Sequence, residues 1–352
     1  MLTRRYQRLL LSPGDLTPSR PDFEVIGAFN PAAVRHDGDV LLLVRVAERP
    51  AERRAGMIGL PRWAPGQGLA VDWLGADEVE LTDPRVVRVK ATGLIRLTFW
   101  SYLRLIRCGD GRSLREVTTT MFGPEHLWEE YGVEDPRLTR IGDRVYFTYV
   151  AVSRHGVVTA LASTTDFRTF ERHGILFCPE NKDVVLFRER IAGAYAAVHR
   201  PVAAQKFSRP EMWLARSDDL LHWGRHQPLL GGREAWENER VGAGPPPILT
   251  DRGWVLLYHG SRPSGRIGVV GTYANSALLL DRNDPARILA RSAEALISPE
   301  ADFELQGFVP GVVFPTGTVE TDNDGLLIYY GAADTGTAVM EVSKSELLAA
   351  LG

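Results

Sequence analysis

Short runs of β-branched, aromatic and aliphatic residues recur along this chain, and each follows a turn that contains Gly, often beside Asp or Asn. Five such units are present, with strand-like runs at 40–45, 145–150, 194–200, 254–259 and 326–330. Turn residues of this kind favour tight reversals, whereas β-branched and aromatic residues favour strands. Short strands in repeated units of roughly 50 residues are the sequence sign of a β-propeller. The pattern therefore predicts an all-β fold.

A further segment, residues 82–117, complicates the number of units. It contains Asp83-Pro84-Arg85, followed by a strand-like run at 95–100. The segment is either one more blade or an extra strand unit within a five-bladed closure, and the pattern leaves both open. In either case a propeller brings the innermost strand of each blade to one central channel, so polar residues distant in sequence converge there. Helix signals are few, and the best candidate is the short C-terminal stretch 344–351.

The length of 352 residues is large for one domain, but closed β architectures of repeated units exceed the usual range, so we expect a single catalytic domain spanning 1–352.

The net charge of −3 gives no electrostatic sign of nucleic-acid binding, so no nucleic-acid partner is expected. Cys108 and Cys178 form neither a metal-binding spacing nor a disulfide framework, which favours the cytoplasm. No apolar run approaches the roughly 20 residues of a membrane span, so no membrane partner is expected. Assembly into a homo-oligomer is left open.

The stretch Glu134-Asp135-Pro136-Arg137 is the first candidate for chemistry. Because Pro is disfavoured inside a strand, the acidic pair is expected at the entrance of the strand that follows. A carboxylate held there on a rigid scaffold suits glycosidic-bond chemistry, which uses paired carboxylates. A purely structural ion pair between the acids and Arg137 is the alternative.

Arg45, Arg200 and His259 lie at the ends of other strand-like runs, and Arg240 lies at the edge of the Gly-Pro segment 242–247. An Arg on an apolar strand requires an anionic partner, either from the protein or from a ligand, because an unpaired buried charge is costly. The planar guanidinium fork suits phosphate. These residues are therefore expected to form an oxyanion pocket, with salt bridges between blades as the alternative.

Seven motifs in a fixed order carry a resemblance to a known family. They are Phe29-Asn30-Pro31-Ala32-Ala33, Glu134-Asp135-Pro136-Arg137, Asn181-Lys182-Asp183, His199-Arg200-Pro201, Gly242-Ala243-Gly244-Pro245-Pro246-Pro247, Tyr258-His259-Gly260 and Tyr330-Gly331-Ala332-Ala333-Asp334. Over residues 25–335 the chain resembles glycoside hydrolase family 130, the β-mannoside phosphorylases and related enzymes. Each motif is weak alone, whereas their joint order is specific.

The resemblance implies a five-bladed β-propeller and inverting phosphorolysis of β-mannosides. Asp135 matches the general acid, which acts through a substrate hydroxyl, while inorganic phosphate attacks C1 and α-mannose 1-phosphate forms. Phosphate is then a co-substrate, with no metal or other cofactor. The residues that match phosphate contacts are Arg45, Arg200, Arg240 and His259. The residues expected to contact the sugar are Asn30, Glu134, Arg137, Lys182, His199 and Asp334.

Two alternatives remain at this stage. Many family members have Lys where this chain has Arg240, and some relatives are inverting mannosidases that activate water with a carboxylate. Glu237 and Glu239 lie beside Arg240 and are the base candidates for that reaction. A non-catalytic carbohydrate-binding propeller is the other alternative. The segment 82–117 resembles the branch associated with β-1,2-linked mannosides.

Overall fold

The computed structural model describes the chain except for residues 203–206, 208 and 266–269. Within the described part nearly every regular element is a strand, and the α-helices are α1 (Asp302–Leu305) and α2 (Lys344–Ala349). Helix α2 starts where the sequence predicts a C-terminal helix, and the Ser343 side chain caps it by accepting a hydrogen bond from the Glu346 amide. The all-β prediction is confirmed. No helix among the described residues is long and apolar enough to cross a membrane.

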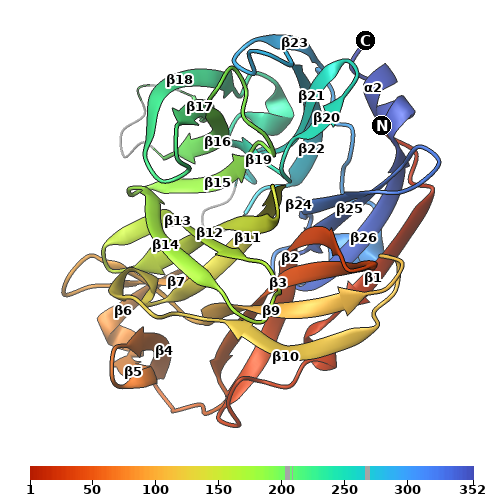
Figure 1. The fold of residues 1–352 in the computed structure, drawn as a ribbon. Helices are drawn as coiled ribbons and strands as arrows, with labels where there is room; N and C mark the ends of the chain where they lie inside the picture. Colours follow the sequence, from red (N-terminus) through yellow and green to blue (C-terminus); the bar gives the residue numbers. More distant parts are fainter. Residues whose placement is uncertain (203–206, 208, 266–269) are drawn as a thin grey trace.

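Most strands lie in four large antiparallel sheets (Figure 1). The first sheet contains β2 (Phe23–His36), β3 (Asp39–Pro50), β9 (Trp100–Cys108), β10 (Glu116–Phe122), β11 (Gly132–Ile141), β12 (Arg144–Ser153), β13 (Gly156–Thr164) and β14 (Glu171–Phe177). The second contains β15 (Asn181–Leu186), β16 (Tyr195–Pro201), β17 (Glu211–Ser217) and β18 (Trp223–Gly231). The third contains β19 (Arg240–Ala243), β20 (Ile248–Thr250), β21 (Gly253–Ser261), β22 (Tyr273–Leu280) and β23 (Ile288–Arg291). The fourth contains β1 (Tyr6–Leu11), β24 (Val313–Glu320), β25 (Gly325–Ala332) and β26 (Gly336–Ser343).

The first sheet consists of two antiparallel halves that meet at one parallel contact. Gly132 at the start of β11 pairs with Ser101 in β9. Added to Gly132, a Cβ atom would lie 2.5 Å from the backbone of Ser101, so only Gly allows this close approach. The two halves therefore join through a narrow seam.

The segment 82–117 does not form a unit of its own. Its first part contributes to a small three-stranded sheet of β6 (Val79–Asp83), β7 (Val86–Val89) and β8 (Ile95–Leu97), beside the hairpin of β4 (Met57–Ala64) and β5 (Gly68–Gly75). Its second part enters the first large sheet, where β9 pairs with β3 from Val40–Cys108 to Glu48–Trp100. The sequence predicts the strands here but not their division between two sheets.

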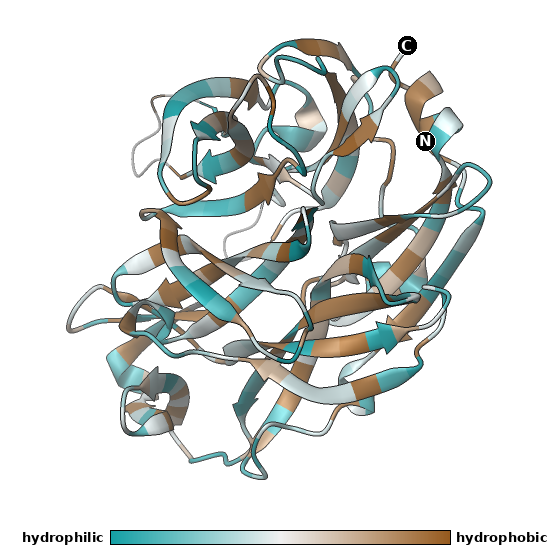
Figure 2. Cartoon of the chain, viewed as in Figure 1, coloured by the Kyte–Doolittle hydropathy of each residue, from teal (hydrophilic) through white to brown (hydrophobic). Residues whose placement is uncertain are grey.

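The sheets stand around a common centre, and the ends of the chain close the circle. Strand β2 contacts β11 and β24, β15 contacts β11 and β19, and β24 contacts β21. Strand β1 pairs with β26, so the first strand of the chain completes the sheet formed by the last three. Apolar residues concentrate along the strands (Figure 2) and form cores between neighbouring sheets. Val198 of β16, for example, shares a core with Leu256 of β21.

Three sheets repeat one buried polar arrangement, which we call the Glu–Tyr–Arg latch. In each, a fully buried Glu in a short helical turn accepts hydrogen bonds from two preceding backbone amides, from a Tyr hydroxyl on β12, β21 or β25, and from an Arg. The three latches are Glu129–Tyr149–Arg172, Glu237–Tyr258–Arg291 and Glu304–Tyr330–Arg4. Both oxygens of each carboxylate accept hydrogen bonds, and an Arg balances the charge, as a buried carboxylate requires.

Candidate active site

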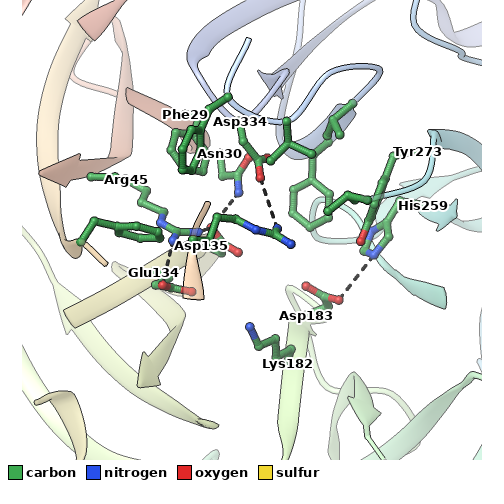
Figure 3. Close-up of a pocket in the computed structure, with 18 of the residues that line it drawn as sticks. Phe29, Asn30, Arg45, Glu134, Asp135, Lys182, Asp183, His259, Tyr273 and Asp334 are labelled. Carbon is green, nitrogen blue, oxygen red and sulfur yellow. Dashed lines mark hydrogen bonds and ion pairs between the residues drawn. The ribbon is translucent and has the colours of Figure 1, made fainter. Parts of the chain in front are cut away.

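One cavity of about 280 Å³ opens at the centre of the sheets, and it collects most of the residues that the sequence singles out (Figure 3). The predicted site residues that line it are Asn30, Arg45, Glu134, Asp135, Lys182, Arg200, Arg240, His259 and Asp334. Apolar and aromatic side chains complete the wall, including Phe29, Phe99, Tyr273, Phe308 and Phe314. Within the described residues, no three His, Cys, Asp or Glu side chains gather closely enough to hold a metal ion.

Backbone bulges on three inner strands turn side chains into this cavity. Asn30, Asp135 and Asp183 have left-handed φ angles of 52°, 49° and 55°. Each interrupts the strand register, on β2, β11 and β15 respectively. A bulge redirects a side chain, and a left-handed non-Gly residue persists only where the surroundings hold it.

The bulge on β11 corrects one expectation from the sequence. The motif that contains Asp135 and Pro136 lies inside strand β11 rather than at its entrance. Pro136 is tolerated because the register shifts between Glu134 and Arg137, so no ladder hydrogen bond is required of it. The acid is consequently held from both sides by regular strand.

On one side of the cavity, Arg45 holds two carboxylates (Figure 3). It donates to Glu134 Oε1 (2.7 Å), to Asp135 Oδ1 (3.0 Å) and to Ser101 Oγ (3.1 Å). Its guanidinium also stacks 4.8 Å from the centre of the Phe29 ring. The anionic partners that the sequence predicts for Arg45 are therefore Glu134 and Asp135 of the protein itself.

Asp135 is further fixed by Asn30, whose Nδ2 donates to Oδ1 at 2.7 Å. Burial alone would raise the pKa of Asp135, but Arg45, Arg137, the Asn30 hydrogen bond and Lys182 together lower it below its usual value. The carboxylate is therefore ionised at neutral pH in the unliganded cavity.

Opposite these acids lies a second group organised by Asp183, which sequence analysis quotes in a motif but does not select. Asp183 Oδ2 accepts from Arg200 Nε (2.8 Å) and lies 3.5 Å from His259 Nε2. Burial strongly lowers the pKa of His259, which stands at about 3 despite Asp183, so the imidazole is neutral at pH 7. Gly242 makes this packing feasible, because a Cβ there would lie 2.4 Å from Asp183 Oδ2. Arg240 completes the group and donates to the Tyr273 hydroxyl (2.9 Å).

Asp334 enters the cavity from the residues after β25, with a left-handed φ of 48°. Burial raises its pKa to about 6, against the lowering effect of Arg85 and Arg45. Arg85, whose Nη1 lies 3.8 Å from Asp334 Oδ2, is a cavity residue that sequence analysis missed. The available signal was the tripeptide Asp83-Pro84-Arg85, which repeats the Asp-Pro-Arg of the acidic motif.

Two residues predicted to contact sugar do not line the cavity. Arg137 is fully buried beneath it, donating to the carbonyl oxygens of Gly244 (2.6 Å) and Asp135 (2.9 Å). His199 stacks on Phe177 with ring centres 4.6 Å apart, and its two ring nitrogens face Asn181 and His226. Arg137 supports the backbone of the acidic motif, whereas His199 packs between its own sheet and Phe177 of β14 in the first sheet.

The two base candidates for a water-using reaction also lie outside the cavity lining. Glu237 is the fully buried acid of one Glu–Tyr–Arg latch. Glu239 accepts from Ser261 Oγ (3.2 Å) and stands 4.0 Å from Arg240. Both carboxylates therefore have structural partners.

Comparisons with known proteins agree on one family. A family model for glycoside hydrolase family 130, described as beta-1,4-mannooligosaccharide phosphorylase, matches residues 98–351. The chain is 39% identical over 345 residues to a beta-1,2-mannobiose phosphorylase of Listeria innocua, covering 96% of this chain and 95% of that protein. It is 35% identical over 239 residues to a 1,2-beta-oligomannan phosphorylase of Thermoanaerobacter sp., covering 66% and 76%. A solved structure of the Listeria innocua enzyme with beta-1,2-mannobiose superposes with a TM-score of 0.91 at 38% identity, covering 97% of this chain and 96% of that one.

Proposed function

The chain belongs to glycoside hydrolase family 130, and on that premise we propose that it catalyses the inverting phosphorolysis of β-mannosides. The products are α-D-mannose 1-phosphate and a shortened sugar, and inorganic phosphate is the co-substrate. The observation that carries the proposal is the division of one cavity into an acid side, Asp135 with Asn30 and Arg45, and a cationic side opposite.

Asp135 is proposed as the general acid. It reaches the leaving oxygen through a sugar hydroxyl, which gives up its proton and is reprotonated by Asp135. The free enzyme holds this carboxylate ionised, so the proton has to arrive with the substrates. A phosphate anion placed beside Lys182 offsets one of the cations that lower the pKa of Asp135, and it thereby favours protonation.

Phosphate is proposed to bind the cationic side. Arg200 and Arg240 offer charge-assisted hydrogen bonds, Lys182 offers a point charge, and the neutral His259 offers a polar ring edge. Arg45 is assigned to the acids instead of phosphate, because all three of its guanidinium nitrogens already donate to Ser101, Asp135 and Glu134, whereas Arg200 gives only Nε and Nη2 to one carboxylate, Asp183. The protein then contributes to catalysis by neutralising the charge of the phosphate and by orienting it toward the sugar.

The Listeria innocua relative, which covers 96% of the chain, and the Thermoanaerobacter relative favour β-1,2-linked mannosides as the substrate class. The sugar is proposed to meet Asn30, Glu134 and Asp334 through its hydroxyls. The proposal includes a five-bladed β-propeller in one domain, with the two halves of the first sheet and the other three large sheets as its blades. A cytoplasmic location stays a prediction.

The direct experiment follows the cleavage of β-1,2-mannobiose with and without inorganic phosphate and identifies the products. Phosphate-dependent release of α-mannose 1-phosphate is expected. Free mannose formed at an equal rate without phosphate would identify a mannosidase. Mannobiose binding without any cleavage would identify a carbohydrate-binding protein.

A further inference from the structure

The small sheet β6–β7–β8 sends one cation into the cavity. Arg85 lies in the turn between β6 and β7, and its Nε and Nη2 donate to the two oxygens of Asp83, each at 3.2 Å. The same Asp83 accepts from the Arg85 amide at 2.7 Å. Thr98, just before β9, binds the turn as well, since its amide donates to the Arg85 carbonyl at 3.0 Å. The guanidinium is thus fixed before any ligand arrives.

The target of this cation is Asp334. Arg85 Nη1 lies 3.8 Å from Asp334 Oδ2, and 18% of the Asp334 side chain is exposed, toward the cavity that both residues line. In the described part of the chain, no group donates a hydrogen bond to the Asp334 carboxylate. Its oxygens are therefore free to accept from a ligand, provided that the group is ionised.

The other charged neighbours of Asp334 largely oppose each other. Arg45 on β3 favours the ionised form, whereas Glu134 and Asp135 on β11 disfavour it. Burial disfavours it most strongly and leaves the pKa at about 6. Arg85 is the strongest of the groups that lower it. Without Arg85, the Asp334 carboxylate would lie near Glu134 and Asp135, and Arg45 would be the cation shared by all three acids.

We propose that Arg85 is a positioning residue that keeps Asp334 as a charged acceptor for the hydroxyls of the bound mannoside. The inference rests on the proposed function and assigns a task to the segment that sequence analysis could not place. Through Arg85, the turn between β6 and β7 makes the small sheet β6–β7–β8 part of the proposed sugar site. Arg85 acts through Asp334 and takes no part in bond breaking.

The test is the pH dependence of mannoside binding and turnover in Arg85→Gln, which keeps a polar side chain but removes the charge. Protonation of Asp334 removes the acceptor, so affinity falls as pH drops through its pKa. In Arg85→Gln that fall is expected at a pH higher by about one unit, within the 1–3 units typical of an Arg neighbour. At the pH of the wild-type midpoint, the mannoside KM is expected to rise severalfold, while the phosphate KM changes little.

Three variants make the result specific. Arg85→Lys keeps the charge and is expected to restore most of the wild-type profile. Arg88→Gln, an exposed change on β7 of the same sheet, is the matched control and should leave the profile unchanged. In an Asp334→Asn background, Arg85→Gln should add no further pH shift, because the group that it acts on is gone.

Calorimetric titration with β-1,2-mannobiose, without phosphate, separates this inference from the proposed function. If the wild-type protein neither binds nor cleaves the mannoside, the proposed function fails. If the wild type binds it and Arg85→Gln binds with the same affinity and pH profile, the role of Arg85 alone is overturned. If Arg85→Gln is folded and its mannoside affinity falls at a higher pH than in the wild type, the role of Arg85 is supported.

Discussion

At the residue scale, the acid side of the cavity gives the sharpest prediction. Asp135→Asn keeps the shape and the hydrogen bond from Asn30 but removes the proton donor. Turnover of a β-mannoside is expected to fall by about two to four orders of magnitude, the usual share of general acid catalysis. Steady-state kinetics measures the loss, and circular dichroism checks folding. Near-normal turnover would remove Asp135 from the mechanism.

The same residue predicts proton uptake when phosphate binds. Free Asp135 has a pKa below its usual value, so it carries no proton near neutral pH. An anion beside Lys182 raises that pKa, and the complex therefore binds more protons than the free protein. Calorimetry in two buffers of different ionisation enthalpy measures the uptake. It should be smaller in Asp135→Asn, and equal uptake in the two proteins would contradict the coupling.

Arg240 predicts where phosphate binds. Its side chain is half exposed and donates to Tyr273, so Arg240→Gln should fold normally. Loss of one charge-assisted hydrogen bond costs about 1.5–3 kcal/mol, or roughly 10- to 150-fold in affinity. The phosphate KM should rise by that factor and the mannoside KM far less. Arg252→Gln, far from the cavity, is the control; a phosphate KM equal to the wild type's in Arg240→Gln would place the anion elsewhere.

At the element scale, the Glu–Tyr–Arg latch separates structural from catalytic carboxylates. Glu237→Gln leaves Arg291 without its anionic partner in a buried place, so the free energy of unfolding should fall by about 1–3 kcal/mol. Denaturant unfolding measures it, with Tyr258→Phe as the milder companion. The folded variant should retain phosphate-dependent turnover within a few-fold. A loss comparable to that of Asp135→Asn would revive Glu237 as a catalytic group.

The elements also show which features of the fold are predictable from sequence. Strand runs and their turns are local, so Val145-Tyr146-Phe147 and its counterparts predict strands correctly. Bulges at Asn30 and Asp183 depend on which strands pair, which no local pattern states. The Glu in each latch follows an aromatic residue, as in Trp236-Glu237, but only packing reveals why.

Side-chain partners are also hard to predict from sequence, because they depend on which distant strands come together. The sequence groups Arg45 with the phosphate cations, yet the Arg45 side chain pairs with Glu134, which lies 89 residues further along the chain. The motif that contains His199 suggests a sugar contact, whereas the side chain stacks on Phe177 of the neighbouring sheet, away from the cavity. Arg85 is missed because its partner Asp334 lies near the other end of the chain. Convergence on one cavity is predictable from the fold class, but the pairing inside it is not.

At the scale of the whole molecule, closure by β1 should dominate stability. Deleting residues 1–11 removes the strand that pairs with β26 and uncovers apolar side chains packed under Leu10 and Leu11. A loss of more than about 4 kcal/mol, or aggregation through the opened edge, is expected. Thermal and denaturant unfolding measure it. The exposed substitution Arg8→Thr should stay within about 0.5 kcal/mol, and a full-stability truncation would show that the ring does not need its closing strand.

That closing strand also sets an order of events during synthesis. Residues 6–11 leave the ribosome more than three hundred residues before their partner strand, residues 336–343. Until then the nascent chain carries a strand with unpaired backbone groups at its front. The circle is completed only after residues 336–343 have emerged, so this docking step joins two strands that are synthesised far apart in time.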